Sequence, residues 1–120
     1  MILVDTCVWV DHLRQGDAKL KALLIEGQVL VHPFVIGELA LGNLRNRETV
    51  LQLLSDLPQT ITASEIEALG FIKRQALFGL GIGYVDAHLL ASARLNGVML
   101  WTQDKRLHEA ALTLGLAHAQ

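Results

Sequence analysis

The chain begins with Met1-Ile2-Leu3-Val4-Asp5-Thr6, and this stretch determines how the residues after it can be arranged. Four apolar residues without polar alternation predict a short strand that is covered on both faces. Asp5 stands where this strand ends, and a helical pattern follows it. Because ligands in open α/β sheets bind outside the carboxyl ends of the strands, Asp5 is either a helix N-cap or part of a functional site. Acids in equivalent positions elsewhere in the chain favour the second interpretation.

Strand and helix patterns alternate through the rest of the chain. Short apolar runs predict strands at 29–31 and 98–101, with weaker edge strands at 60–62 and from Leu116 onward. Helical patterns cover residues 7–14, 18–25, 33–42, 48–56, 65–78, 84–96 and 105–114. Since the connections are short, this order predicts one α/β domain over residues 1–120. We expect a parallel sheet of four or five strands with helices on both faces, joined by right-handed crossovers.

The composition is unusually apolar for a small domain. Hydrophobic residues make up 52% and charged residues 18% of the chain, and the mean hydropathy is +0.38, whereas an average domain has roughly 25% charged residues. We therefore expect a second copy or a partner protein to cover part of the surface. No apolar run reaches the roughly 18 residues of a membrane helix, and the start of the chain lacks a signal-peptide pattern. With the single Cys7 favouring a reducing compartment, these features predict a cytoplasmic protein.

Four of the twelve acids differ from the rest. Eight have polar neighbours or a place on a helix surface, and Glu67 in particular fits a capping box with Ser64. Asp5 and Asp104, by contrast, end the two strongest strands. Asp86 opens a helix, and Glu38 is the single charge in an apolar helix that we expect to be buried, where an unpaired carboxylate is costly. If the two strands are neighbours, their carboxyl ends bring these acids together.

Such a group of carboxylates needs a counter-charge. Like charges raise one another's pKa and oppose folding, whereas Mg²⁺ or Mn²⁺ takes oxygen ligands and keeps some of its waters. A site of this kind activates a water molecule and clamps a phosphate for in-line displacement. The hydroxyls of Thr6 and Thr102 are placed to orient a carboxylate or that water. The residues themselves therefore predict a metal site that acts on phosphate esters.

The same residues resemble a known family. The stretches that carry the resemblance are Ile2-Leu3-Val4-Asp5-Thr6, Glu38 in the third helix, Tyr84-Val85-Asp86-Ala87, and Leu100-Trp101-Thr102-Gln103-Asp104-Lys105-Arg106-Leu107. They look like the PIN-domain ribonucleases, most closely the VapC-type toxins of toxin–antitoxin pairs. No single motif is specific, but four acids in this order, over essentially the whole chain, are. Cys7 departs from the pattern, because many relatives have Asn or Ser there.

The resemblance implies a fold and an activity. It implies a three-layer α/β/α sandwich, with Thr102 as a supporting hydroxyl for the catalytic metal-binding carboxylates Asp5, Glu38, Asp86 and Asp104. It also implies an endoribonuclease that uses Mg²⁺, with Mn²⁺ as a substitute, to cleave transfer RNA or another structured RNA by metal-activated water.

The resemblance also implies partners, namely a second copy of the chain in a homodimer and a small VapB-like antitoxin. An amphipathic helix of the antitoxin would fit an apolar groove near residues 34–54. The expected lining residues are Phe34, Leu41, Leu44, Val50, Leu51 and Leu54.

Other functions fit the residues less well. A phosphoryl-aspartate enzyme of the haloacid-dehalogenase type needs a second Asp where Cys7 stands, and a receiver domain needs an acid pair and a switch lysine. The glycines of 79–83 lack the Gly-Lys-Ser/Thr of a phosphate loop. Cys7 lies in an apolar run, so we expect a small core residue there and not a nucleophile. The main alternative is a PIN-fold module that binds RNA or protein without cutting it, and the intact acids argue against it.

Overall fold

A three-stranded parallel sheet lies at the centre of the computed structural model, which describes residues 1–119. The strand order is β2-β1-β3, so β1 (Ile2–Val4) lies between β2 (Val29–Leu30) and β3 (Met99–Trp101). The register places Leu3 opposite Leu100, and both side chains are fully buried. The two strands that end in acids are therefore neighbours and are covered on both faces, as the sequence predicted.

The sheet has three strands within residues 1–119, whereas four or five were expected. The two weak edges are reduced to isolated parallel bridges, one between Val31 and Gln59 and the other between Leu100 and Ala117. The first edge cannot lengthen because helix α3 begins two residues after Val31. The strand predicted from Leu116 onward includes Gln120, which lies outside the described residues. The predicted order of the chain is thus correct, but each edge pairs through one residue only.

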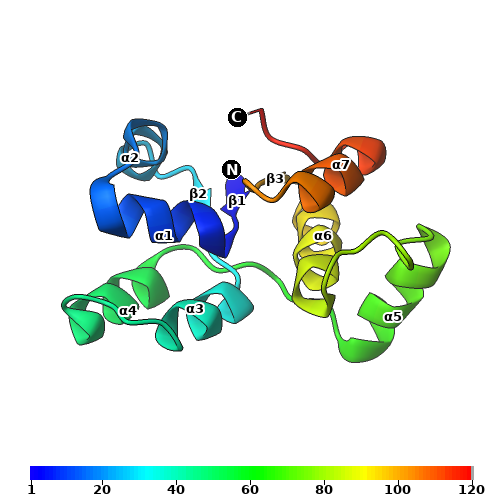
Figure 1. Ribbon diagram of the computed structural model, residues 1–120, viewed down its shortest axis with the longest axis horizontal. Coiled ribbons are helices and arrows are strands. Elements are labelled where there is room, and N and C mark those ends of the chain that lie inside the picture. Colours follow the sequence, from blue (N-terminus) through cyan, green and yellow to red (C-terminus); the bar gives the residue numbers. More distant parts are fainter. Residues whose placement is uncertain (120) are drawn as a thin grey trace.

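Seven helices surround this sheet in the described part of the chain. They are α1 (Thr6–Gln15), α2 (Ala18–Ile25), α3 (Pro33–Ala40), α4 (Arg47–Asp56), α5 (Glu65–Arg74), α6 (Tyr84–Asn96) and α7 (Lys105–Leu114). Figure 1 shows α1 to α4 on one side of the strands and α5 to α7 on the other, which confirms the three-layer arrangement. No helix within residues 1–119 is long and apolar enough to cross a membrane.

Local signals fix most of the helix ends. The Ser64–Glu67 capping box is present with both of its hydrogen bonds, as predicted. Helix α5, however, ends at Arg74 and does not continue to Phe78. Ala76 has a left-handed backbone conformation (φ 51°), which no α-helix can contain. The chain turns there and leads into the glycine-rich segment before α6.

Helix α3 is not buried on all sides, which corrects the interpretation of its apolar sequence. Val35 and Leu39 face the core, whereas Phe34 is 41% exposed and Leu41, at the end of the helix, is 89% exposed. Glu38 is also exposed, so its charge does not carry the expected cost of burial. The reason is that α3 lies in an outer layer, where one stripe packs inward and the other side faces solvent (Figure 1). Apolar side chains are therefore left at the surface.

A groove of about 610 Å³ opens between α1, α3 and the start of α4. Its lining includes two of the residues predicted for a partner groove, Leu44 and Val50. The other four do not line it: Leu54 belongs to the core, and Leu41 points away into solvent. The groove lies closer to α1 than predicted, and its remaining lining residues are Val10, Leu13, Arg14, Glu38, Leu39, Gly42, Asn43, Arg45 and Asn46.

Candidate active site

Asp5 is both a helix cap and a fixed acid at the carboxyl edge of the sheet. Its Oδ1 accepts the N–H of Thr6 at 2.7 Å, which begins α1. Its Oδ2 accepts the hydroxyl of Thr102 at 2.7 Å. Thr102 follows β3 directly, so this hydrogen bond joins the ends of the two neighbouring strands across 97 positions of sequence. With the side chain only 7% exposed, Asp5 is held in one orientation.

Asp104 repeats this arrangement at the end of β3, but at the surface. Its Oδ1 accepts the N–H of Leu107 at 2.9 Å and so caps α7. Its own N–H donates to the Thr102 hydroxyl oxygen at 3.0 Å. Thr102 thus donates to Asp5 and accepts from Asp104, and it is completely buried. A single hydroxyl fixes the relative position of two of the predicted site acids.

Glu38 and Asp86 approach the same edge from the two helical layers. The Thr6 hydroxyl donates to Glu38 Oε1 at 2.6 Å, which ties α3 to the start of α1. The N–H of Gly83 donates to Asp86 Oδ2 at 2.9 Å, which closes the first turn of α6. The sequence placed Gly83 in a flexible turn and gave no sign of this role. Each of these acids is therefore oriented by a hydrogen bond from another residue.

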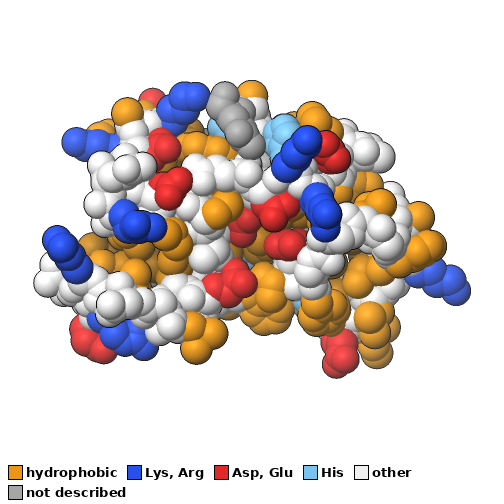
Figure 2. All heavy atoms as spheres, in the orientation of Figure 1, with side chains coloured by type: hydrophobic (Ala, Val, Ile, Leu, Met, Phe, Trp, Pro, Cys, Tyr) orange, Lys and Arg blue, Asp and Glu red, His pale blue; other side chains and the backbone are white. Residues whose placement is uncertain are grey.

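The pKa of Asp86 shows that the four acids Asp5, Glu38, Asp86 and Asp104 share one region. Burial raises this pKa most, and the negative charges of Asp5, Asp104 and Glu38 raise it further, while the Gly83 hydrogen bond lowers it. No lysine or arginine of the described chain is among the groups that shift it. Figure 2 shows the acidic side chains gathered near the centre of one face, where the two helical layers meet.

Carboxylate oxygens suit a hard divalent cation, although the four acids do not already form a preformed metal site. Among residues 1–119, no three His, Cys, Asp or Glu side chains are positioned so that they could already hold a metal ion. Glu38, Asp86 and Asp104 each keep one carboxylate oxygen that accepts no hydrogen bond within this range. Because Mg²⁺ binds proteins through one or two carboxylates and retains several waters, the acids fit such an ion.

Cys7 packs against the core, but it is only partly buried, and its thiol lies beside the acids. Its Sγ is 3.5 Å from Asp5 Oδ2 and 3.7 Å from Thr102 Oγ1, and it accepts the N–H of Gln103 at 3.4 Å. Burial, and then the charge of Asp5, raise the pKa of the thiol, against the opposing effect of the Gln103 hydrogen bond. The thiol therefore stays protonated near neutral pH and donates to Asp5. Cys7 stands in the first turn of α1, two residues after the acidic N-cap Asp5, and this spacing is the feature of the sequence that could have predicted its position beside the acids.

Comparison with known proteins identifies the family of the chain. Residues 2–112 match the PIN domain family. The chain is 48% identical to Ribonuclease VapC32 of Mycobacterium tuberculosis strains H37Rv and CDC 1551, over 100% of this chain and 98% of the relative.

Two solved structures share the fold at lower identity. FitAcB from Neisseria gonorrhoeae has a TM-score of 0.65 at 21% identity and covers 98% of this chain and 95% of its own. FitAB bound to an IR36 DNA fragment has a TM-score of 0.64 at 20% identity, over 100% and 98%. Since the family model covers residues 2–112 and the identity to the ribonuclease extends over the full length, the chain belongs to the PIN-domain family, among its VapC-type members.

Proposed function

We propose that this protein is a divalent-metal-dependent endoribonuclease that acts as the toxin of a toxin–antitoxin pair. The full-length relatives named as ribonucleases support the RNA-cleaving activity. The observation that carries the metal dependence is the grouping of four carboxylates, since within residues 1–119 no lysine or arginine is among the groups that shift the pKa of Asp86. Mg²⁺ is the expected ion, with Mn²⁺ as a substitute, and structured RNA such as transfer RNA is the expected substrate in the cytoplasm.

In this mechanism the protein positions its acids before the substrate arrives. A divalent cation held here would lower the pKa of a water molecule and would offset the negative charge of the phosphate. Glu38, Asp86 and Asp104 would hold it through their free oxygens, and Asp5 through a remaining lone pair. The hydrogen bonds from Thr6, Gly83, Leu107 and Thr102 keep the four carboxylates from rotating. Little reorganisation is then required when the RNA phosphate arrives.

The charge balance makes RNA binding depend on the occupied site. The whole chain carries a net charge of −2, and without the four acids the remainder would carry +2. That remainder is only weakly basic, while bare carboxylates repel phosphate. RNA affinity must therefore come from the bound cation together with basic side chains close to the site.

The groove beside α1 and α3 supports a mode of inhibition by a VapB-like antitoxin. Leu44 and Val50 give it an apolar lining, and Glu38 belongs both to this lining and to the four acids. A partner helix seated in the groove could therefore place an Arg on Glu38, and a guanidinium would replace the charge of the metal. Exposed apolar residues such as Leu41 and Phe34, outside this groove, leave a separate surface for a homodimer.

A nuclease assay with defined products tests the activity. The purified protein should cut RNA in Mg²⁺ or Mn²⁺ and leave 3′-hydroxyl and 5′-phosphate ends, the products when water attacks the phosphate and the 3′-oxygen leaves. The Asp86→Asn variant should stay folded and lose cleavage. Products with 2′,3′-cyclic phosphates would refute the mechanism. Binding of RNA by the wild-type protein without any cleavage would instead support a PIN-fold binding module.

Co-purification tests the partner site. Leu44→Asp should weaken the complex with the antitoxin while nuclease activity is retained, because it places a charge in the groove. Leu112→Asp is the matched control, since Leu112 is exposed on α7 and does not line the groove. If the two variants bind the antitoxin equally well, the groove is not its binding site.

A further inference from the structure

One arginine lies in an unusual place on the glycine-rich segment before α6. The side chain of Arg106 packs directly on Gly81: a Cβ at that glycine would lie 2.4 Å from Arg106 Nη1 and 3.0 Å from its Cδ. Gly81 also has a left-handed backbone (φ +77°). Only a glycine at this position allows the guanidinium to rest there, so the segment positions Arg106.

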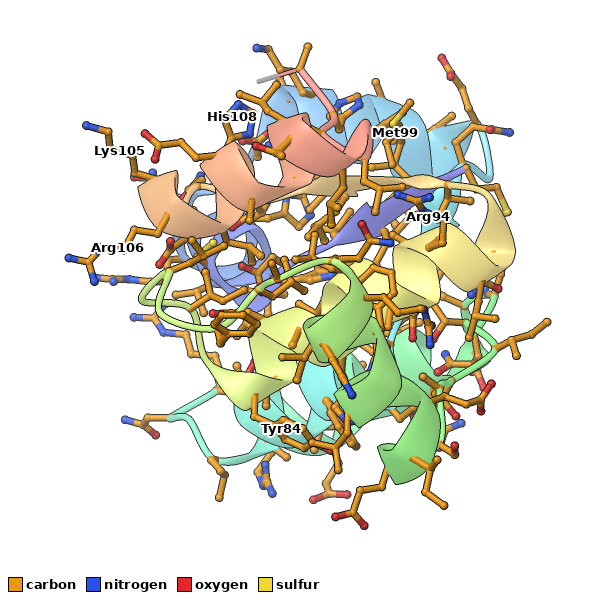
Figure 3. The ribbon with its side chains drawn as sticks, turned by 90° about the vertical axis from the view of Figure 1, so that its right-hand side faces the viewer. Tyr84, Arg94, Met99, Lys105, Arg106 and His108 are labelled. Atoms are coloured by element: carbon orange, nitrogen blue, oxygen red, sulfur yellow. The ribbon has the colours of Figure 1, made fainter. Side chains whose placement is uncertain are left out.

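This contact joins the two segments that carry Asp104 and Asp86. Arg106 follows Asp104 by two residues in the first turn of α7, and Gly81 precedes Gly83, whose N–H holds Asp86. Figure 3 shows Lys105 and Arg106 projecting together from the start of α7, toward the face on which Figure 2 shows the acids. The guanidinium therefore lies at the rim of the candidate active site, where the α7 and α6 sides meet.

The charge of Arg106 is not used by the protein itself. Within residues 1–119 its guanidinium makes no hydrogen bond or ion pair, whereas that of Arg94 donates to the carbonyl of Leu114 at 3.0 Å. Its place in the helix is also unfavourable, because α7 has two basic residues and no acidic one in its first turn. A cation at a helix N-terminus opposes the macrodipole. Folding therefore gives no reason for a cation here.

We propose that Arg106 is a substrate-binding residue that contacts a phosphate of the RNA next to the one being cleaved. This inference rests on the proposed function, which brings RNA to the four acids. A guanidinium suits this task because its planar fork binds phosphate oxygens through two hydrogen bonds. Gly81 keeps it in place, so the phosphate next to the scissile one is held at a fixed distance from Asp86 and Asp104. Arg106 thereby supplies positive charge at the site in a chain whose remainder is only weakly basic.

Salt-dependent RNA binding tests this role without relying on cleavage. The probe is a short fluorescein-labelled single-stranded RNA of mixed sequence, titrated with the Asp86→Asn protein in Mg²⁺ at several salt concentrations. Loss of one phosphate contact should lower the slope of log K against log salt by about 0.7 to 1. Arg106→Ala should show this loss, and Arg106→Lys should restore most of the slope. Arg74→Ala is the control, since Arg74 lies over Gly70 of its own helix and should leave the slope unchanged.

A pair of glycine variants distinguishes the effect of where the Arg106 guanidinium lies from the effect of its charge. Gly81→Ala should lower the slope as Arg106→Ala does, because the new Cβ displaces the guanidinium while its charge remains. Gly79→Ala carries the same backbone strain (φ +74°) but meets no atom within 4 Å, so it should keep the parental slope. Circular dichroism confirms that each variant is folded. In the nuclease assay of otherwise wild-type protein, Arg106→Ala should raise KM about tenfold and change kcat less.

The outcomes separate this inference from the proposed function. An unchanged slope in Arg106→Ala, equal slopes in Gly81→Ala and Gly79→Ala, or no salt-dependent RNA binding by the parent protein would overturn the role of Arg106. If the wild-type protein fails to cut RNA while Arg106→Ala still lowers the slope, the nuclease proposal fails and the phosphate contact stands.

Discussion

Two junctions of strand and helix have the same design and different surroundings. β1 leads through Asp5 into α1, and β3 leads through Asp104 into α7, and each acid caps its helix with one oxygen. At Asp5 the second oxygen is held by the buried Thr102 hydroxyl, whereas at Asp104 it accepts no hydrogen bond within residues 1–119. The comparison shows that both acids cap a helix, but both oxygens of Asp5 are engaged in the fold, while Asp104 keeps one oxygen for the site.

The largest expected effect does not distinguish the two junctions. Asp5→Ala and Asp104→Ala should each reduce RNA cleavage at least about 100-fold, because each removes a positioned charge from the site. Single-turnover rates at saturating Mg²⁺ measure this loss. Retention of near wild-type rates by either variant would remove that acid from the proposed mechanism.

The free energy of unfolding should distinguish the two junctions. Both substitutions remove an N-cap, at a cost of about 1 kcal/mol. Asp5→Ala also removes the hydrogen bond that the buried Thr102 hydroxyl donates to a charged group, for about 2 kcal/mol more. Urea denaturation of metal-free protein should therefore show a clearly larger loss of unfolding free energy for Asp5→Ala. Equal losses would mean that the bond between Thr102 and Asp5 adds nothing to the fold.

Thr102→Val tests the hydroxyl that connects the two junctions. The variant keeps the shape of the side chain and loses both the bond to Asp5 and the bond from the Asp104 N–H. We expect a loss of roughly 1 to 3 kcal/mol in unfolding free energy and slower cleavage with both acids still present. Thr60→Val, at a buried threonine whose hydroxyl makes no hydrogen bond to any residue of 1–119, is the control that should cost less.

The smallest expected effect is on the pKa of Asp86. Asp5 raises this pKa more than Asp104 does, so Asp5→Asn should lower it further than Asp104→Asn. Carbon NMR of the Asp86 carboxyl in metal-free protein measures both shifts. The reverse order would contradict the comparison.

The same pKa has a consequence for stability. The pKa of Asp86 in the folded protein is raised above 3.8, the ordinary value for an aspartate. Its contribution to the free energy of unfolding is therefore complete below pH 3.8 and is lost as pH rises through the folded-state pKa. His32 acts in the opposite direction: burial lowers its pKa to about 4, and its contribution is lost as pH falls from 6.5. A melting curve mixes the two contributions, so the carboxyl signal itself should be followed.

Much of the site could be predicted because it follows from strand order. Asp5 and Asp104 end neighbouring parallel strands, and such ends must meet at one edge of the sheet. The apolar pattern of α3, by contrast, could not show that Glu38 is exposed, because a face covered by a partner has the same sequence as a buried one. Contacts between distant residues, such as Arg106 on Gly81 or Cys7 beside Thr102, leave no periodic signal in the sequence.

The dependence of RNA cleavage on a divalent cation tests the central claim most directly. Wild-type protein is stripped with EDTA, and the cleavage rate is measured as Mn²⁺ or Mg²⁺ is added back. The four carboxylates predict no cleavage in EDTA and a saturable return of activity with either ion, which Asp86→Asn does not show. Cleavage that continues at the same rate in EDTA would contradict the claim that these acids act through a metal.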